Sequence, residues 1–574
     1  MELSINAIRI IEARYLKKDE KGKIIETPEE MFQRVARYVA QAEKTFDSQA
    51  RVEKYAESFY QTMSSLEFLP NSPTLMNACR ELGQLSACFV LPIKDSLESI
   101  FESLKNTALI HQSGGGTGFS FSHLRPKNDI VSTTSGIASG PVSFMEVFNK
   151  ATDIIKQGGT RRGANMGILR ADHPDIEEFI TLKRTPLKLE SFNLSVGIPD
   201  KFMQAVKADT TYGLINPRTQ KLVRTVSAKD LFNLIIQCAW DNGEPGILFL
   251  DRINRDNPTP HLGQIESTNP CGEQPLLPFE SCNLGSINLA KMLRKADGMY
   301  ELDWRKLEKT VCLAVRFLDD VIEVNRYPLP QIRQISRANR KIGLGIMGFA
   351  HLLILLGISY NSEQSLALAS EIMNFIQEKG HEASQELAGQ RDAFPNFPAS
   401  IYNLSNQPPI RNATVTTIAP TGTLSLIAGC SAGIEPIYAL FSTRIAAGNI
   451  DISEMDPLFR KMAADLAFLS PELEKKIRET GQLGNNPAIP AKIRNLFMTA
   501  FAISPSQHVR IQAAFQQHTD NAVSKTINFP SGVTPDEIRD ALLLAFDLEC
   551  KGVTVYRDQS RAGQVFRCGL ERLC

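Results

Sequence analysis

The sequence has no excess of charge of either sign. Lysine and arginine together number 63, and aspartate and glutamate also number 63. Proteins that bind nucleic acids through the phosphate backbone usually have a basic surface, and this balance gives no support to such a function. A local basic pocket for a phosphorylated small molecule is still compatible with a net charge of zero. We therefore expect no nucleic acid among the partners of the protein.

The sequence also lacks a segment of the kind that targets or anchors a protein at a membrane. The N-terminal residues mix charges from the second position and contain no apolar core of signal-peptide length. The longest apolar run, residues 342–359, is interrupted by four glycines and by His351. It is therefore more typical of a buried helix or a strand–helix join than of a membrane span.

Cysteine is too sparse for a disulfide scaffold. The ten cysteines are scattered over 574 residues. This distribution is typical of a cytosolic protein with mostly reduced thiols, in which a disulfide is more often transient and catalytic than structural. We expect a cytoplasmic location.

The order of the segments indicates an α/β protein. Residues 28–67 have helical periodicity, with Thr27 and Asp47 as expected caps. From residue 71 onward, short β-like runs alternate with helical segments, which predicts a largely parallel sheet, either as a barrel or as an open sheet. Residues 446–510 are predicted to be a helical, polar insertion. The last residues contain few large apolar side chains and are predicted to be a mobile tail.

The segment NPCGEQ, residues 269–274, places a thiol between an amide and a carboxylate. A lone cysteine is most often a small buried hydrophobe. In an extended loop, however, alternating positions point to one side, so Asn269, Cys271 and Glu273 would face one ligand. An amide, a carboxylate and a reactive sulfur together suit general-base and hydrogen-bond chemistry on a polar substrate. A cysteine protease is the alternative, and it would need a histidine to activate the thiol.

Three glycine-rich loops suggest a phosphate ligand. They lie at residues 111–121, 157–167 and 419–429, each next to a helical segment. Backbone N–H groups and small hydroxyl side chains at a helix start bind phosphate well, and the last loop combines both. None of the three has the Walker A spacing or the dinucleotide fingerprint. A tight turn explains each loop alone, but together with the cysteine loop they favour a nucleotide substrate.

Seven stretches of the chain, in order, resemble the catalytic subunit of ribonucleotide reductase. They are FLPNSPTLMNA (68–78), LSACFVLPIKDSLESIF (85–101), SGGGTGFSFSHLRP (113–126), GGTRRGANMGIL (158–169), NPCGEQ (269–274), ESCNLGSINL (280–289) and APTGTLS (419–425). The resemblance implies a ten-stranded α/β barrel that reduces ribonucleotides to deoxyribonucleotides and so supplies DNA precursors. From the resemblance and the order of segments we predict a helical N-terminal region at 1–70, the barrel at 71–557 and a flexible redox-active tail at 558–574.

The resemblance implies a role for each polar residue of the cysteine loop. Cys271 would become a thiyl radical and abstract the 3′ hydrogen of the ribose. Glu273 would take the proton of the 3′-hydroxyl, and Asn269 would hold the hydroxyls. Cys88 and Cys282 match the family's redox pair, which supplies two electrons and is left as a disulfide when the 2′-hydroxyl departs as water.

The same resemblance assigns binding residues. Those expected at the substrate phosphates, which we call the phosphate loop, are Pro420, Thr421, Gly422, Thr423 and Leu424. Those expected to line the rest of the substrate site are Ser72, Ala87 and Gly116. Those expected to hold a deoxynucleotide effector between two subunits, and so to imply a homodimer, are Asp95, Ser96, Leu97 and Arg125. Asp95 or Ser96 is equally suited to cap a helix. Because the resemblance starts close to residue 1, we expect the family's additional ATP-binding domain to be absent. Both a diphosphate and a triphosphate substrate are compatible with these residues.

The resemblance also bears on how the radical is made. The oxygen-dependent class receives it from a second subunit through two adjacent tyrosines, but Val555 precedes Tyr556 here. Residues 551–561, KGVTVYRDQSR, instead match the adenosylcobalamin-dependent class, so adenosylcobalamin is the expected cofactor and no metal site in the chain itself is expected. The cobalamin-contacting residues stay unassigned, because no Asp-x-His-x-x-Gly motif is present. The alternatives are the large subunit of a two-subunit metal-radical reductase and a degenerate nucleotide-binding regulator.

Two cysteines in the last seven residues, Cys568 and Cys574, are expected to form a tail redox pair. A disulfide buried in the barrel is out of reach of a protein reductant, so a mobile tail would carry electrons inward. Nearby arginines favour the thiolate that exchange requires. We therefore expect a thioredoxin- or glutaredoxin-like reductant as a partner. The alternative is a frayed end with two idle thiols.

Overall fold

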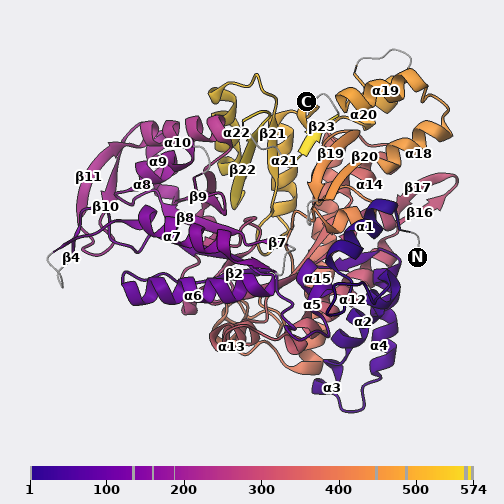
Figure 1. The fold of residues 1–574 in the computed structure, drawn as a ribbon, viewed down its shortest axis with the longest axis horizontal. Coiled ribbons are helices and arrows are strands. Elements are labelled where there is room, and N and C mark those ends of the chain that lie inside the picture. Colours follow the sequence, from indigo (N-terminus) through magenta and orange to yellow (C-terminus); the bar gives the residue numbers. More distant parts are fainter. Residues whose placement is uncertain are drawn as a thin grey trace.

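The computed structural model describes residues 3–131, 136–157, 161–185, 188–446, 450–484, 489–560 and 566–569. The N-terminal helices lie against one side of an α/β unit that is built around a ten-stranded sheet (Figure 1). None of the helices in these ranges combines the length and the apolar character that a membrane span requires.

Four helices form the N-terminal region: α1 (Ile5–Arg14), α2 (Pro28–Ala40), α3 (Glu43–Phe46) and α4 (Val52–Ser64). Thr27 caps α2 as predicted, because its hydroxyl accepts from the Glu30 N–H while the Glu30 carboxylate accepts from the Thr27 N–H. Asp47 is also a cap, but at the C-terminal end of α3 and not at the start of the next helix. Arg51 occupies the N-cap position of α4.

The central sheet has the ten strands that the resemblance implied. In spatial order they are β1 (Phe68–Pro70), β15 (Ser281–Asn288), β2 (Cys88–Val90), β3 (Gly116–Ser120), β8 (Asn165–Arg170), β9 (Phe192–Ile198), β12 (Gly246–Phe249), β22 (Gly552–Arg557) and β21 (Thr526–Phe529), with β18 (Ile342–Met347) paired to β15. The strands from β2 to β12 are parallel, as are the β15–β18 and β21–β22 pairs. Antiparallel pairs join β15 to β1 and β2, and β12 to β22. The sheet is therefore largely parallel, as predicted.

The segment 413–418 closes this sheet into a barrel. Leu344 of β18 pairs with Thr416 on one side of the segment. On the other side Ile418 pairs with Val523, which lies just before β21. The two edge strands are thus linked through a segment whose continuation is the phosphate loop.

Helices cover the outside of the barrel and form with it the two larger of four hydrophobic clusters in the described residues. One core lies between the sheet and the helices α6 (Leu97–Ser113), α7 (Pro141–Ile154) and α10 (Ala228–Asn242), and it includes Phe119 and Phe121. The other core is shared by β15, β18, the N-terminal helices and α12 (Trp304–Val324). Buried strands of this kind read as nearly continuous apolar runs, as β18 does.

The long apolar run at 342–359 is the predicted strand–helix join, since β18 is followed by α14 (Phe349–Leu356). The predicted helical region 446–510 differs at its start. A hairpin of β19 (Phe441–Ala446) and β20 (Ile450–Met455) precedes its helices, and β23 (Phe566–Cys568) adds a third strand. Local periodicity could not reveal this, because the pairing of β19 with β23 joins segments more than a hundred residues apart. Part of the predicted tail is therefore held in a sheet.

Candidate active site

The cysteine loop is the tip of a short hairpin. β13 (Ser267–Thr268) and β14 (Pro275–Leu276) pair antiparallel on either side of it. The Gly272 N–H donates to Asn269 O at 3.1 Å, and the Asn269 N–H donates to Gln274 O at 3.2 Å. The loop is therefore a tight turn, and the expectation of an extended segment was wrong. A proline and a glycine inside the segment turn the chain, and the glycine has a φ of +85°.

The turn nevertheless brings the predicted catalytic side chains together. Asn269 and Glu273 are buried, whereas Cys271 is exposed. Asn269 Nδ2 lies 3.1 Å from Cys88 Sγ. Glu273 and Cys271 are close enough to that sulfur to affect its ionisation. An amide, a carboxylate and the thiols therefore surround one point.

Cys88 and Cys282 are direct neighbours on paired strands. They are register partners in the antiparallel β2–β15 ladder, and their side chains are almost completely buried. Opposed residues in such a ladder have Cα atoms about 4.5–5.5 Å apart, a separation that a disulfide can span. Both are free thiols in this structure. A disulfide between them would need no rearrangement of the barrel.

Burial determines the protonation state of this cysteine pair. Burial and the nearby Glu273 carboxylate raise the pKa of Cys88 well above its usual value. Burial also raises the pKa of Cys282 well above its usual value, although the charge of Lys341 opposes the shift. Lys341 is in turn held by the Glu280 carboxylate at 2.7 Å. Both sulfurs are therefore neutral thiols at pH 7 and can supply protons as well as electrons.

The phosphate loop is fixed by a strained turn ahead of α17 (Leu424–Ala428). Thr421 has a φ of +53°, and its hydroxyl accepts from the Gly433 N–H at 2.8 Å. Gly422 is exposed and Thr423 is half-buried. The loop thus presents backbone N–H groups and the Thr423 hydroxyl, which caps no helix N–H group.

The other predicted substrate residues lie at the starts of neighbouring elements. Ser72 begins α5 (Ser72–Asn77), and Ala87 packs with the two buried cysteines just ahead of β2. Gly116 opens β3 as the register partner of Cys88. A Cβ atom at Gly116 would lie 2.9 Å from a carbon of Pro270, so the close packing of the cysteine hairpin on β3 requires glycine here.

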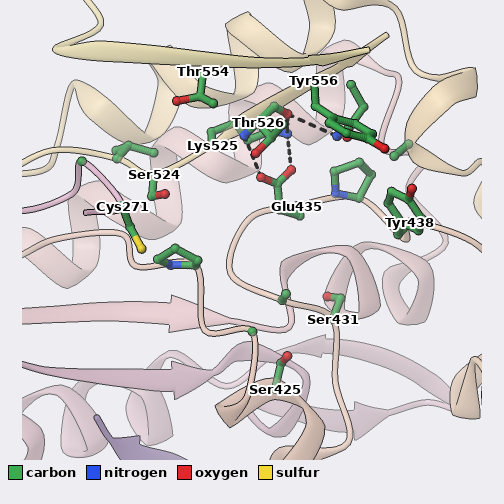
Figure 2. Close-up of a pocket in the computed structure, with 18 of the residues that line it drawn as sticks. Cys271, Ser425, Ser431, Glu435, Tyr438, Ser524, Lys525, Thr526, Thr554 and Tyr556 are labelled. Carbon is green, nitrogen blue, oxygen red and sulfur yellow. Dashed lines mark hydrogen bonds and ion pairs between the residues drawn. The ribbon is translucent and has the colours of Figure 1, made fainter. Parts of the chain in front are cut away.

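A cavity of about 600 Å³ opens beside Cys271. Pro420 and Gly422 of the phosphate loop form part of its wall. Figure 2 shows Cys271 at one side of the cavity and Tyr438 and Tyr556 at the other. Its volume falls within the range of about 300–1,000 Å³ that is typical of small-molecule sites.

Sequence reasoning missed an ion pair in the cavity wall. Glu435 accepts from Lys525 Nζ and, at 2.8 Å, from the Thr526 N–H (Figure 2). Lys525 Nζ also lies 2.9 Å from His508 Nδ1. Burial lowers the pKa of Lys525, and burial together with the Lys525 charge holds the pKa of His508 well below its usual value. The available signal was a lysine directly before the short apolar segment that forms β21.

Tyr556 has a tyrosine neighbour in space although not in sequence. Val555 is buried on β22, and it borders the cavity as Tyr556 and Tyr438 do. Burial, and then the Tyr556 phenol, raise the pKa of Tyr438. His351 and Asp456 also line the cavity, and His351 Nε2 lies 2.8 Å from Asp456 Oδ2. None of Tyr438, His351 and Asp456 was among the predicted site residues.

The predicted effector residues lie together at the surface. Ser96 is the N-cap of α6, where its hydroxyl accepts from the Ser99 N–H at 3.2 Å. Arg125 Nε pairs with Asp95 Oδ2 at 2.9 Å. Leu97 is 64% exposed. The start of α6 therefore presents a carboxylate, a guanidinium and an apolar side chain on one surface.

Of the two predicted tail cysteines, Cys568 lies within the described residues. Cys568 lies on β23, opposite Ser442 of β19, and is buried and disulfide-bonded. Cys574 lies outside the described residues.

Comparison with known proteins covers nearly the whole chain. The family model described as "Ribonucleotide reductase, barrel domain" matches residues 86–556, and the model described as "Ribonucleotide reductase, all-alpha domain" matches residues 1–83. The chain is 48% identical over 624 aligned positions to a protein of Thermoplasma acidophilum named "Vitamin B12-dependent ribonucleoside-diphosphate reductase". That alignment covers 99% of this chain and 81% of the relative.

A second relative and a solved structure agree with this result. A protein of Mycobacterium tuberculosis with the same printed name is 50% identical over 566 positions, covering 98% of this chain and 81% of the relative. The alpha subunit of the class Id ribonucleotide reductase of Actinobacillus ureae superposes with a TM-score of 0.78 at 22% identity, covering 97% of both chains. At that identity the superposition bears on the fold alone.

Proposed function

The chain belongs to the ribonucleotide reductase family, and we infer that it is a vitamin B12-dependent reductase that converts ribonucleoside diphosphates to deoxyribonucleotides. One structural observation supports this function above the others. The cysteine hairpin presents Cys271 beside Asn269 and Glu273, next to the paired thiols of Cys88 and Cys282. This arrangement supplies a radical site, a base and a two-electron reductant around one sugar.

We propose that the chain's own residues carry out the reaction as follows. The Cys271 thiyl radical takes the hydrogen atom from the 3′ carbon of the ribose. Glu273 accepts the proton of the 3′-hydroxyl, and the Asn269 amide holds the hydroxyl groups in place. The 2′-hydroxyl, protonated by one of the neutral thiols, then leaves as water.

The cysteine pair balances the electrons. Cys88 and Cys282 together give two electrons and two protons, and their sulfurs form one S–S bond. One proton leaves with the 2′-hydroxyl as water, and the other proton and the two electrons form the new C–H bond at the 2′ carbon. Glu273 then returns its proton to the 3′ oxygen. The raised pKa values of Cys88 and Cys282 support their role, because a protonated thiol can deliver a proton as well as an electron. At the end of the cycle the hydrogen atom returns from Cys271 to the 3′ carbon, which regenerates the radical on sulfur.

We propose that the nucleoside part of adenosylcobalamin, the expected cofactor, binds in the cavity beside Cys271. The cavity has room for a nucleoside, and its wall offers two phenols and the Glu435–Lys525 ion pair as hydrogen-bonding groups. We propose that Tyr438, Tyr556 and Glu435 contact the bound group. When bound, adenosylcobalamin supplies the one-electron oxidising equivalent that removes the hydrogen atom from the Cys271 thiol.

We propose that the enzyme is a homodimer that binds a deoxynucleotide effector at the start of α6. Leu97, Phe101 and Leu109 are exposed and are spaced by four and eight residues, so they form one apolar stripe along α6. Val147 and Ile154 expose a second stripe on α7, which packs beside α6. A second copy of the chain would bury both stripes and complete the site formed by Asp95, Ser96, Leu97 and Arg125. We also propose a thioredoxin- or glutaredoxin-like reductant and a cytoplasmic location.

The test is turnover by the purified chain alone. With adenosylcobalamin, dithiothreitol and a ribonucleoside diphosphate, we expect stoichiometric formation of the deoxynucleotide. Chromatography of the nucleotides measures it. Activity that ignored cobalamin and required a second, metal-containing subunit would overturn the assignment in favour of the two-subunit class. The absence of turnover under both conditions would favour the degenerate regulator.

A further inference from the structure

Helix α1 carries an arginine where its pattern calls for an apolar residue. The buried positions of α1 are Ala7, Ile10, Ile11 and Arg14, which follow the spacing of one helix face. This face packs on α17, directly behind the phosphate loop. Arg14 is only 8% exposed. A guanidinium is therefore buried at the contact between the N-terminal region and the phosphate loop.

Arg14 differs from the other buried arginines in having no carboxylate beside it. In the described part of the chain five arginines are buried, and the other four each have a carboxylate oxygen within 4.0 Å. These four are Arg252, Arg340, Arg391 and Arg411. No carboxylate of the described residues lies within that distance of Arg14. Within the described part of the chain, the positive charge of Arg14 is therefore left without a counter-ion.

The hydrogen bonds of Arg14 are also incomplete. Its Nη1 donates to Thr423 Oγ1 at 3.3 Å, and its Nε is buried without an acceptor. The neighbouring Tyr15 hydroxyl lies 2.8 Å from Ser72 Oγ. Arg14 and Tyr15 therefore each contact a predicted substrate residue, Thr423 and Ser72 respectively. The Arg14 guanidinium also lies over the Tyr15 ring, 5.5 Å from its centroid, so its one hydrogen-bond partner among the described residues is a hydroxyl of the phosphate loop.

A buried charge without a partner is costly, so its retention needs a reason. A buried cation normally has an ion pair or a full set of hydrogen bonds, because desolvation otherwise opposes folding. The phosphate loop itself presents only N–H and hydroxyl groups, which cannot neutralise the charge of a diphosphate. A guanidinium suits phosphate particularly well, since its N–H groups can bind two oxygens at once.

We propose that Arg14 binds the phosphate groups of the nucleotide substrate and supplies their counter-charge. The N-terminal helical region thereby contributes a residue to the substrate site of the barrel, and a nucleoside diphosphate completes the contact between them. This inference rests on the proposed function, because it takes the phosphate loop as the place where the substrate binds.

The test compares Arg14→Gln with Arg9→Gln, a control at an exposed position of the same helix. Binding of cytidine diphosphate is measured by calorimetry without cobalamin or reductant. We expect Arg14→Gln to weaken binding by roughly 10- to 100-fold, as loss of a charge-assisted contact does. Arg9→Gln should bind like the unmodified chain, and Arg14→Lys should keep part of the affinity because it keeps the charge.

Thermal unfolding separates this role from a structural one. Without nucleotide, Arg14→Gln should melt at or above the temperature of the unmodified chain, because it removes an uncompensated buried charge. With cytidine diphosphate, the unmodified chain should gain stability and Arg14→Gln should gain much less. A large loss of stability without nucleotide, or unchanged affinity for the diphosphate, would overturn the proposal. Turnover by the unmodified chain alongside unchanged affinity in Arg14→Gln would refute only this inference and leave the proposed function intact.

Discussion

At the residue scale, exposure separates the three cysteines of the site into two kinds. Cys271 is exposed at the tip of a hairpin and borders the cavity, whereas Cys88 and Cys282 are buried on paired strands. An exposed sulfur can meet a cofactor and a substrate. Two buried, adjacent and protonated sulfurs are suited to forming a disulfide once the sugar radical has been made.

This division predicts different outcomes for substitutions within the site. Cys271→Ser should abolish turnover and hydrogen exchange at the 3′ position while leaving nucleotide affinity within about twofold, because its side chain lies at the surface. Cys88→Ser or Cys282→Ser should allow the radical step to begin but should block multiple turnovers. Substrate tritiated at the 3′ position distinguishes the two cases. If all three variants were inactive and unfolded, the cysteines would be structural.

Two adjacent aspartates of α12 provide a second contrast at this scale. Asp319 accepts from Arg340 at 2.8 Å and from Arg391 at 2.9 Å. Burial alone would raise the pKa of Asp319, but the arginine charges outweigh burial and hold this pKa well below its usual value. Among the described residues Asp320 accepts from Arg391 alone, at 2.8 Å, and burial raises its pKa well above the usual value. Its second carboxylate oxygen is buried without a partner.

The two aspartates should therefore respond differently to the same change. Asp319→Asn leaves buried arginines short of a carboxylate, and we expect it to cost about 3–5 kcal/mol of unfolding free energy. Asp320→Asn replaces a group that is readily protonated, and we expect a cost of about 1 kcal/mol or less. Urea unfolding of the two variants measures the difference. Equal losses would contradict the opposite pKa shifts.

At the scale of elements, the segment 413–418 depends on one carboxylate outside the barrel strands. Asp520 Oδ2 accepts from the Val415 N–H at 2.7 Å and from the Thr416 N–H at 3.2 Å. His381 of α15 (Glu363–Arg391) lies 3.0 Å from the same oxygen. The Asp520 charge raises the pKa of His381. Burial alone would raise the pKa of Asp520, but the His381 charge and the N–H donors outweigh burial and lower this pKa. This pair therefore fixes the segment that leads into the phosphate loop.

His381→Gln should consequently lose stability in a pH-dependent way. A histidine whose pKa is raised on folding contributes stability that is fully present below its unfolded pKa of about 6.5, and this contribution disappears as the pH rises through the folded pKa. We expect the variant to lose about 1.5–3 kcal/mol at pH 6 and less at pH 9. Melting temperatures of both proteins across this range give the comparison. A loss that grew with pH would contradict the assignment.

The elements also show what the sequence could predict. Thr27, the strand–helix join at 342–359 and the largely parallel sheet follow from local patterns, and all three are present. The grouping of Asn269, Cys271 and Glu273 was expected for a reason that proved wrong, because the loop is a turn. Pairing of β19 with β23 depends on contacts between distant segments, which local patterns do not contain.

Some residues of the site were not predicted for the same reason, namely that they come together only through contacts between distant segments. Lys525, Glu435 and Tyr438 are ordinary residues in the sequence, and they become a cavity wall only when β21 and the segment after the phosphate loop meet. Arg14 is different, because a charged residue on the apolar face of α1 is visible in the pattern itself. That signal becomes informative once the structure shows that no carboxylate compensates it.

At the scale of the whole molecule, the N-terminal region and the barrel share one core. Side chains of α2 and α4 pack with those of α12, β15 and β18. Glu43 of α3 adds a buried ion pair to Arg391 of α15 at 2.7 Å. The predicted division at residue 70 therefore separates two kinds of secondary structure within a continuous hydrophobic core. A contact of Arg14 with the substrate would extend that continuity into the active site.

The C-terminal tail matters at this scale because electrons must pass from a reductant outside the protein to the buried Cys88–Cys282 pair. The Cys88–Cys282 pair is buried, so a protein reductant of ordinary size cannot reach a disulfide there. Cys568 is disulfide-bonded on β23 and would have to leave β19 in order to move inward. In the described part of the tail, the three residues of β23 and the Gly569 N–H, which donates to Phe441 O at 2.9 Å, hold it there, and this is a short pairing to break.

We therefore expect the double variant Cys568→Ser with Cys574→Ser to separate two kinds of reductant. Turnover driven by thioredoxin should fall by at least about tenfold, because exchange between the buried pair and the outside needs a mobile thiol pair. Turnover driven by dithiothreitol should stay near that of the unmodified chain, since a small dithiol can diffuse into the barrel. Cys79→Ser, which removes an exposed cysteine elsewhere, is the matched control and should change neither rate. Thioredoxin-driven turnover that persisted in the double variant would exclude the tail from electron transfer and leave the β19–β23 pairing with a structural role alone.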